Sequence, residues 1–187
     1  VSGSLGAQLL LWEVATAVAG RLLGINPFDQ PDVESAKQAA RDLMGQGAGA
    51  ASQPAAADGA VEIRALGGDW LPEGTGTLEG AVDALLQQLD PESGYLAVMV
   101  YLDRIAHADL ADVQAALVSR TGRPVTFGWG PRFLHSTGQY HKGGPAQGVY
   151  LQVTGAPDAD LEVPGKDFTF GEFIAAQAAG DANVLAD

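Results

Sequence analysis

The sequence contains no cysteine, which excludes disulfides, thiolate metal sites and a cysteine nucleophile. It also lacks a basic run: 10 Lys and Arg stand against 23 Asp and Glu, giving a net charge of −13. An acidic surface repels nucleic acids and anionic membranes, so we expect neither as a partner. The absence of cysteine is compatible with the cytoplasm, where we expect the protein to act.

Aromatic residues are also scarce, at 7%, whereas hydrophobic residues make up 47% of the chain. This composition suits a soluble core built from small side chains. Residues 5–23 are apolar nearly all round, which predicts a buried helix. Glu13 and Arg21 interrupt that run and favour a core helix over a membrane span; Glu13 is better explained as a salt-bridge partner than as a catalytic acid. The sequence shows no secretory signal and begins without methionine, so we expect the carboxyl-terminal part of a longer protein.

The periodicity of the sequence predicts three segments. Residues 1–45 form a helical segment, residues 46–60 a flexible linker rich in Gly, Ala, Ser and Pro, and residues 61–187 an α/β domain. In the last segment, strands alternate with helices, which predicts a mainly parallel sheet flanked by helices. The expected strands are 61–66, 95–102, 125–129 and 148–154, and the expected helices are 5–23, 31–45, 77–89, 109–121 and 168–180.

The expected helix at 31–45 carries a lysine on its apolar face. Pro31 suits the first helical position, because a proline there removes no intrahelical hydrogen bond. Val33, Lys37, Ala40 and Met44 then recur on one side of the helix, so Lys37 interrupts an apolar stripe. From periodicity alone, this lysine either reaches past small residues to solvent or serves at a site.

Two motifs carry a resemblance to a known family. The first is Phe28-Asp29-Gln30, followed by Val33-Glu34 and Lys37, and it resembles the F-D-Q-x-G-V-E-x-x-K signature of glucose-6-phosphate isomerases, with Asp32 in place of the glycine. The second spans residues 130–145 and is similar to the extended carboxyl-terminal region of bacterial isomerases, including those fused behind a transaldolase.

The resemblance implies a function and a set of roles. It implies that Gln30 contacts a sugar-phosphate substrate and that Lys37 helps to open the sugar ring, after which a glutamate moves a proton through a cis-enediol. It places that glutamate and the phosphate loop upstream of residue 1, so we expect this chain alone to be inactive. It also implies a sugar-isomerase-like three-layer αβα fold with an N-terminal helical pair, a homodimer in the intact enzyme, and no cofactor or metal.

Residues 130–145 are expected to form a cationic loop after the strand 125–129. Ligands bind beyond the carboxyl ends of strands in open α/β sheets, so we predict substrate contacts there. A dimer contact, a clamp for the chain's own carboxylates and a rigid connector remain open, as do a non-catalytic sugar-phosphate-binding module and a subunit-interaction domain. We do not expect a metal site, because the two histidines lie six residues apart without a carboxylate at ligand spacing. The candidate contacts are Arg132, His135, His141 and Lys142.

Overall fold

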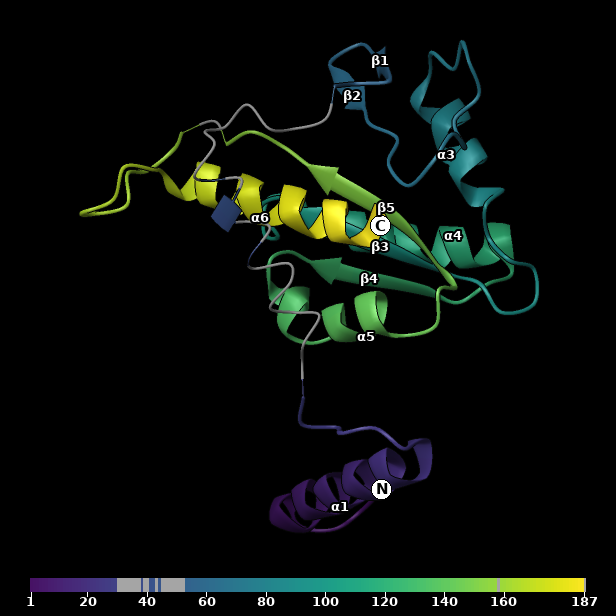
Figure 1. Cartoon of the computed structure of the whole chain (residues 1–187), viewed down its shortest axis with the longest axis vertical. Coiled ribbons are helices and arrows are strands. Elements are labelled where there is room, and N and C mark those ends of the chain that lie inside the picture. Colours follow the sequence, from purple (N-terminus) through teal and green to yellow (C-terminus); the bar gives the residue numbers. More distant parts are fainter. Residues whose placement is uncertain (30–37, 39–40, 43, 45–52, 158, 187) are drawn as a thin grey trace. The chain divides into compact units, whose positions relative to one another are not determined.

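A computed structural model of the chain describes residues 1–29, 38, 41–42, 44, 53–157 and 159–186 (Figure 1). The chain forms two compact units, Val1–Pro31 and Asp32–Asp187. Among the described helices, none combines the length and the hydropathy that a membrane span requires.

The first unit consists of helix α1, Leu5–Leu23, and the turn that follows it. The Ser4 side chain caps the start of α1 by accepting a hydrogen bond from the Ala7 amide, and Gly24 ends it in the left-handed conformation at φ 70°. The predicted bounds of this helix are confirmed, whereas the predicted burial is not found within the first unit. Of the described residues in α1, Gly20 alone is buried, where Pro27 packs against it, and Trp12 is 61% exposed. The helix is mostly exposed within the first unit because only the short turn that follows Gly24 packs against it there.

The expected helix at 31–45 lies mostly outside the described residues. The four positions that are described within it, Gln38, Arg41, Asp42 and Met44, are helical. Gln30 and Lys37 both lie outside the described residues. The second member of the helical pair and the two signature contacts therefore stay predictions.

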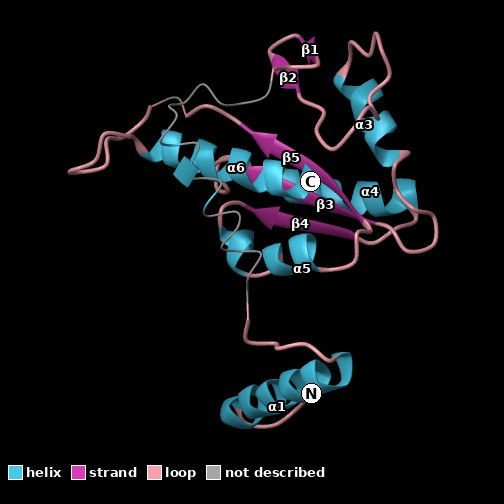
Figure 2. Cartoon of the chain, in the orientation of Figure 1, coloured by secondary structure: helices cyan, strands magenta, loops and turns pink. Residues whose placement is uncertain are grey.

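The second unit is built on a parallel three-stranded sheet with the order β4-β3-β5 (Figure 2). Its strands are β3, Tyr95–Tyr101; β4, Val125–Trp129; and β5, Gly148–Thr154. All seven residues of the central strand β3 are buried, as its continuous apolar run predicts for a strand covered on both faces. The positions predicted for these three strands are confirmed, to within one residue at the end of β3.

Helices cover both faces of this sheet. Alternate residues of β3 point to opposite faces, so Tyr95, Ala97, Met99 and Tyr101 share one cluster and Leu96, Val98 and Val100 share the other. The first cluster packs against η2, Arg132–His135, and α6, Phe170–Ala186. The second packs against α4, Val113–Thr121, and the end of α3, Leu78–Leu86. The described part of this unit is thus α/β, with a parallel sheet between helices.

Several bounds differ from the sequence prediction for physical reasons. Helix α6 continues to Ala186 because Gly180 is buried within it and does not end it. The segment 109–121 divides into η1, Ala108–Asp112, and α4. The expected strand at 61–66 shortens to β2, Val61–Ile63, which pairs antiparallel with β1, Ala56–Asp58, outside the parallel sheet. Strand β1 occupies part of the range that the sequence suggests is a linker.

Candidate functional site

The candidate site lies where β3 and β4 end, at the carboxyl edge of the parallel sheet. A hollow of about 300 Å³ opens there, lined by Leu102, Arg104, Trp129, Gly130 and Arg132. The residues that follow two adjacent parallel strands meet at this edge, which is where open α/β sheets bind ligands. Two arginines therefore line one hollow in a chain whose net charge is strongly negative.

Backbone geometry places the two arginines. The Gly130 amide donates a hydrogen bond to the Val100 carbonyl at 2.8 Å, which holds the chain on the sheet just before Arg132. A Cβ atom at residue 130 would lie 2.5 Å from the Tyr101 ring, so the close approach requires glycine. After β3, the Asp103 carboxylate accepts the Ile105 amide at 2.8 Å and turns the chain at Arg104.

The charges at this edge include a carboxylate as well as the two arginines. The backbone hydrogen bonds from Ile105 and Ala106 lower the pKa of Asp103, which stays ionised beside Arg104. Among the described residues, neither Arg104 nor Arg132 forms an ion pair with a carboxylate. An arginine without a carboxylate partner can bind a phosphate or a carboxylate ligand through two parallel hydrogen bonds.

A second hollow of about 200 Å³ lies beside β4, beneath η2 and α5, Gly138–Gly143. Its apolar wall includes Met99, Phe127 and Phe133, and its polar wall includes Ser136, Thr137 and His141. Arg132 and Trp129 line both hollows, so the two adjoin each other.

His141 is the buried polar residue of this second hollow. Its residue exposure is 9%, and its ring lies between those of Phe133 and Tyr150, with centroids 6.4 and 5.6 Å away. Burial, together with the neighbouring Lys142 charge, lowers the pKa of His141 to about 4, so the ring is neutral at pH 7. Its Nδ1 atom is buried and has no hydrogen-bond partner among the described residues. A neutral imidazole nitrogen can donate to or accept from a ligand hydroxyl.

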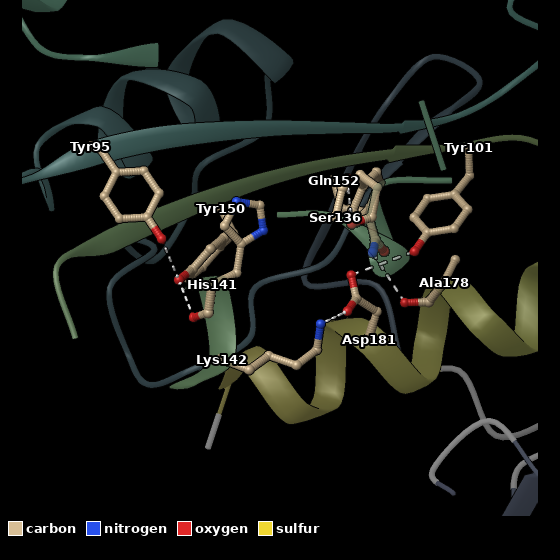
Figure 3. Close-up of polar contacts among 10 residues, drawn as sticks. Tyr95, Tyr101, Ser136, His141, Lys142, Tyr150, Gln152, Ala178 and Asp181 are labelled. Carbon is tan, nitrogen blue, oxygen red and sulfur yellow. Dashed lines mark hydrogen bonds and ion pairs between the residues drawn. The ribbon is translucent and has the colours of Figure 1, made fainter. Parts of the chain in front are cut away.

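Lys142 is not among the residues that line either hollow, and its side chain reaches into the contact between α5 and α6 (Figure 3). Its ammonium forms an ion pair with Asp181, and the Tyr101 hydroxyl donates to the same carboxylate at 3.5 Å. Burial raises the pKa of Asp181 against the opposing effects of Lys142 and Tyr101. The structure therefore shows the clamp for the chain's own carboxylates that the sequence left open, and a substrate contact by Lys142 stays a prediction.

The prediction of a loop at residues 130–145 is wrong, because η2 and α5 occupy most of this range. Phe133 and Leu134 are buried against the sheet, and this packing stabilises short helices that glycine-rich sequence does not favour. Arg132 and His135 are exposed on η2, while His141 and Lys142 turn inward on α5. The structure thus brings Arg132 and His141 to adjoining hollows and does not bring all four predicted contacts together.

Sequence reasoning missed Arg104, Trp129 and Asp181. The first two could have been found, because Trp129 ends β4 and Arg104 follows β3 by three residues. Asp181 gave no signal, since its partner Lys142 lies 39 residues earlier in the chain. Within the described ranges, no three His, Asp or Glu residues are grouped closely enough to hold a metal ion.

One similarity to a known protein bears on function. A segment of 43 residues is 49% identical to a glucose-6-phosphate isomerase of Rubrobacter xylanophilus. The segment covers 23% of this chain and 10% of the length of that protein. No protein-family model matches the chain, and no solved structure matches it. The similarity weakly suggests an isomerase relationship and leaves the activity of the whole protein as a proposal.

Proposed function

We propose that this chain is the carboxyl-terminal part of a glucose-6-phosphate isomerase, which interconverts glucose 6-phosphate and fructose 6-phosphate. The observation that carries the proposal is the 49% identity to such an enzyme over 43 residues. The signature residues Gln30 and Lys37 and the parallel α/β unit are consistent with it. In this proposal the fold is of the sugar-isomerase type, and the protein acts in glycolysis and gluconeogenesis in the cytoplasm.

In the proposed reaction, Gln30 contacts the substrate and Lys37 assists ring opening. Proton transfer by a positioned side chain contributes about 10²- to 10⁴-fold to a rate. The glutamate that moves the proton between C1 and C2 belongs to sequence upstream of this chain, and the intact enzyme is a homodimer. The isolated chain is therefore inactive, and the reaction needs no cofactor or metal.

An isomerase assay tests this proposal in two proteins: the 187-residue chain and a longer protein that includes its upstream sequence. We expect turnover in the longer protein alone, and a loss of about 10²-fold or more in the longer protein that carries Lys37→Ala. Lys166→Ala, which removes an exposed lysine from the second unit, is the matched control and retains the activity. Normal turnover by the isolated chain, or full activity of Lys37→Ala, would contradict the proposal.

A second candidate function is a sugar-phosphate-binding module without catalysis. The hollow that Arg104 and Arg132 share favours it, because two arginines can hold a phosphate without any acid or base nearby. Titration calorimetry with fructose 6-phosphate beside the isomerase assay separates the two functions. Binding without turnover in the longer protein would replace the isomerase by the module.

A subunit-interaction domain is the third candidate, and the exposed apolar side chains of α1 favour it. In that case, replacing Trp12 and Leu22, which are exposed on α1, by alanine changes the oligomeric state and leaves substrate affinity unchanged. Sedimentation velocity with matched titration of fructose 6-phosphate measures both quantities. The opposite pattern, with weaker binding in an unchanged assembly, removes this candidate.

A further inference from the structure

The chain between β5 and α6 folds back on itself as a short antiparallel ribbon, which Figure 1 shows in yellow-green just before α6. A bridge joins Glu162 and Thr169, and the Phe170 amide donates to the Leu161 carbonyl at 2.9 Å. Neighbouring residues of a strand point to opposite sides, so Leu161 and Phe170 lie together on the side away from Glu162 and Thr169. The ribbon therefore has an apolar side and a polar side.

The apolar side is exposed and continues onto the first turns of α6. Leu161 is 69% exposed and Phe170 is 49% exposed, and Phe173 and Ile174 on the same face of α6 are each 38% exposed. Phe168 stacks on Phe173 with ring centroids 5.9 Å apart, which holds the ribbon against the helix. We call Leu161, Phe170, Phe173 and Ile174 the ribbon patch. Single exposed apolar residues are ordinary on a protein surface, whereas a contiguous group marks an interaction site.

The charges around the ribbon patch are mostly negative. Between residues 159 and 174 the chain has one cation, Lys166, and four carboxylates, those of Asp160, Glu162, Asp167 and Glu172. The Thr169 hydroxyl donates to Asp160 at 2.5 Å, and this bond lowers the pKa of Asp160, so that carboxylate is ionised at pH 7. A partner that matches this surface needs cations beside an apolar centre.

We propose that the ribbon patch binds a basic amphipathic helix of another protein. The apolar face of such a helix covers Leu161 and Phe170, and its Lys and Arg side chains lie near the carboxylates. The patch offers side chains rather than backbone groups, which suits a helix better than an added strand. The surface lies wholly within the second unit and goes beyond the proposed isomerase function, because it uses none of the residues to which that function assigns a role.

Charge disfavours a second copy of this chain as the partner. The chain has a net charge of −13, so two copies repel each other. Helix α1 of a second copy offers apolar side chains, but its charged residues are Glu13 and Arg21, which cancel. It therefore cannot match a surface that presents four carboxylates, whereas a lysine-rich or arginine-rich helix can.

Fluorescence anisotropy with labelled peptides and the 187-residue chain tests the surface. The probe is an amphipathic helix of about four turns, with leucines on one face and lysines on the other. A second peptide has glutamates in place of the lysines. We expect the lysine peptide to bind at least about tenfold more tightly than the glutamate peptide, and to bind more weakly as the salt concentration rises.

One substitution tests the apolar part of the surface. Leu161→Ser weakens the lysine peptide about tenfold, because covering a leucine side chain contributes roughly that factor or more to an affinity. Leu161 lies outside the helices and strands, so its replacement keeps the fold, which circular dichroism checks. Val118→Ser, which removes a side chain that is 42% exposed on α4, is the matched control and leaves the affinity unchanged.

A pair of substitutions tests the charged part. Glu162→Gln with Asp167→Asn weakens the lysine peptide and reduces the salt dependence of its binding. Asp69→Asn with Glu73→Gln removes the same charge from exposed positions before α3 and is the matched control, which retains the affinity.

Several results would overturn the proposal and leave the isomerase proposal untouched. Equal affinities of the wild type and Leu161→Ser, or of the two peptides, would show that the ribbon patch does not select a basic helix. Loss of binding in Trp12→Ala, with Leu161→Ser unaffected, would place the peptide on α1. Sedimentation velocity that shows a dimer of the wild type and a monomer of Leu161→Ser would assign the patch to a second copy.

Discussion

Lys142 on α5 and Asp181 on α6 form an ion pair in the interior of the second unit, with side chains only 2% and 0% exposed. Both charges lose their hydration on folding, and their attraction and the Tyr101 hydroxyl offset that cost. The pair joins two helices that cover the same face of the sheet. Each charge is therefore tolerated inside the protein because the other is present.

Removing one partner is expected to destabilise the second unit strongly. Lys142→Met leaves the Asp181 carboxylate buried alone, and we expect the free energy of unfolding to fall by about 3–5 kcal/mol. The double variant Lys142→Met/Asp181→Leu recovers most of that loss, because it removes both desolvation costs. Urea denaturation followed by circular dichroism measures the three values.

The control for this prediction is the surface pair between Arg120 and Asp83, whose side chains are 52% and 40% exposed. Arg120→Gln should cost less than about 1 kcal/mol. If the two substitutions at Lys142 and Asp181 instead have additive costs, the pair does not act as a unit and the interpretation is wrong.

His141 predicts a pH dependence of stability with a definite sign. Burial lowers its pKa from 6.5 to about 4, so the unfolded chain takes up the proton at a higher pH than the folded chain. The stability that this group contributes is complete above pH 6.5 and is lost as the pH falls toward 4, by up to about 3 kcal/mol at 1.36 kcal/mol per pKa unit.

The measurement is the free energy of unfolding of the wild type and His141→Phe between pH 7 and pH 4. We expect the difference between the two proteins to change across this interval in favour of the phenylalanine variant at low pH. His107→Gln, at an exposed position outside both hollows, is the matched control and follows the wild type. Parallel curves for the wild type and His141→Phe would show that the histidine is not buried in its neutral form.

Arg123 is expected to stabilise the turn that precedes β3. Its guanidinium donates three hydrogen bonds of 2.8–2.9 Å. The Nε atom donates to the Gly94 carbonyl, and the two Nη atoms donate to the carbonyls of Pro91 and Glu92. We expect Arg123→Ala to cost about 1–2 kcal/mol, since the outer two of these bonds are exposed to water. Arg123→Lys should recover little of this stability, because an ammonium cannot donate in the three directions of the planar guanidinium. Lys166→Ala is the control and should not change the stability. Thermal unfolding ranks the variants, and full rescue by lysine would refute this account.

The start of α6 offers a fourth prediction. Thr169 and Glu172 form a reciprocal cap: the Thr169 hydroxyl accepts the Glu172 amide at 3.1 Å, and the Glu172 carboxylate accepts the Thr169 amide at 2.8 Å. Thr169→Ala should lower the free energy of unfolding by about 1 kcal/mol, and Thr169→Ser should retain most of the stabilisation that the cap provides.

The same hydroxyl also donates to Asp160, and this bond is the main cause of the lowered pKa of that carboxylate. Thr169→Ala should therefore raise the pKa of Asp160 toward 3.8, and a side-chain NMR titration measures the change. Because a lowered carboxylate pKa stabilises the fold above pH 3.8 and loses that effect below it, the cost of the variant shrinks in acid. An unchanged Asp160 titration would contradict the assigned hydrogen bond.

The sheet could be predicted from the sequence because its signals are local. β3 is a continuous apolar run, and Val125–Trp129 and Gly148–Thr154 were predicted with their observed bounds. The Thr77 cap of α3 was also predicted, and its side chain accepts the Gly80 amide. Each of these features depends on a few neighbouring residues.

The site could be predicted only in part, because its decisive contacts are between distant residues. Arg132 was identified from its position after a strand, but the glycine-rich segment around it gave no sign of η2 and α5, which depend on packing against the sheet. The inward turn of Lys142 depends on Asp181, far away in the sequence. The burial predicted for α1 is not found within the first unit, because periodicity indicates an apolar surface without showing what covers it.

The internal charge pair has a consequence for biosynthesis. Asp181 is added 39 residues after Lys142, which at about 5–20 residues per second is a delay of about 2–8 s. During that interval the growing polypeptide contains the Lys142 ammonium group but not yet the Asp181 carboxylate with which it pairs. A nascent chain can therefore complete one side of its sheet early, and it must leave the other side open to water until α6 has emerged from the ribosome.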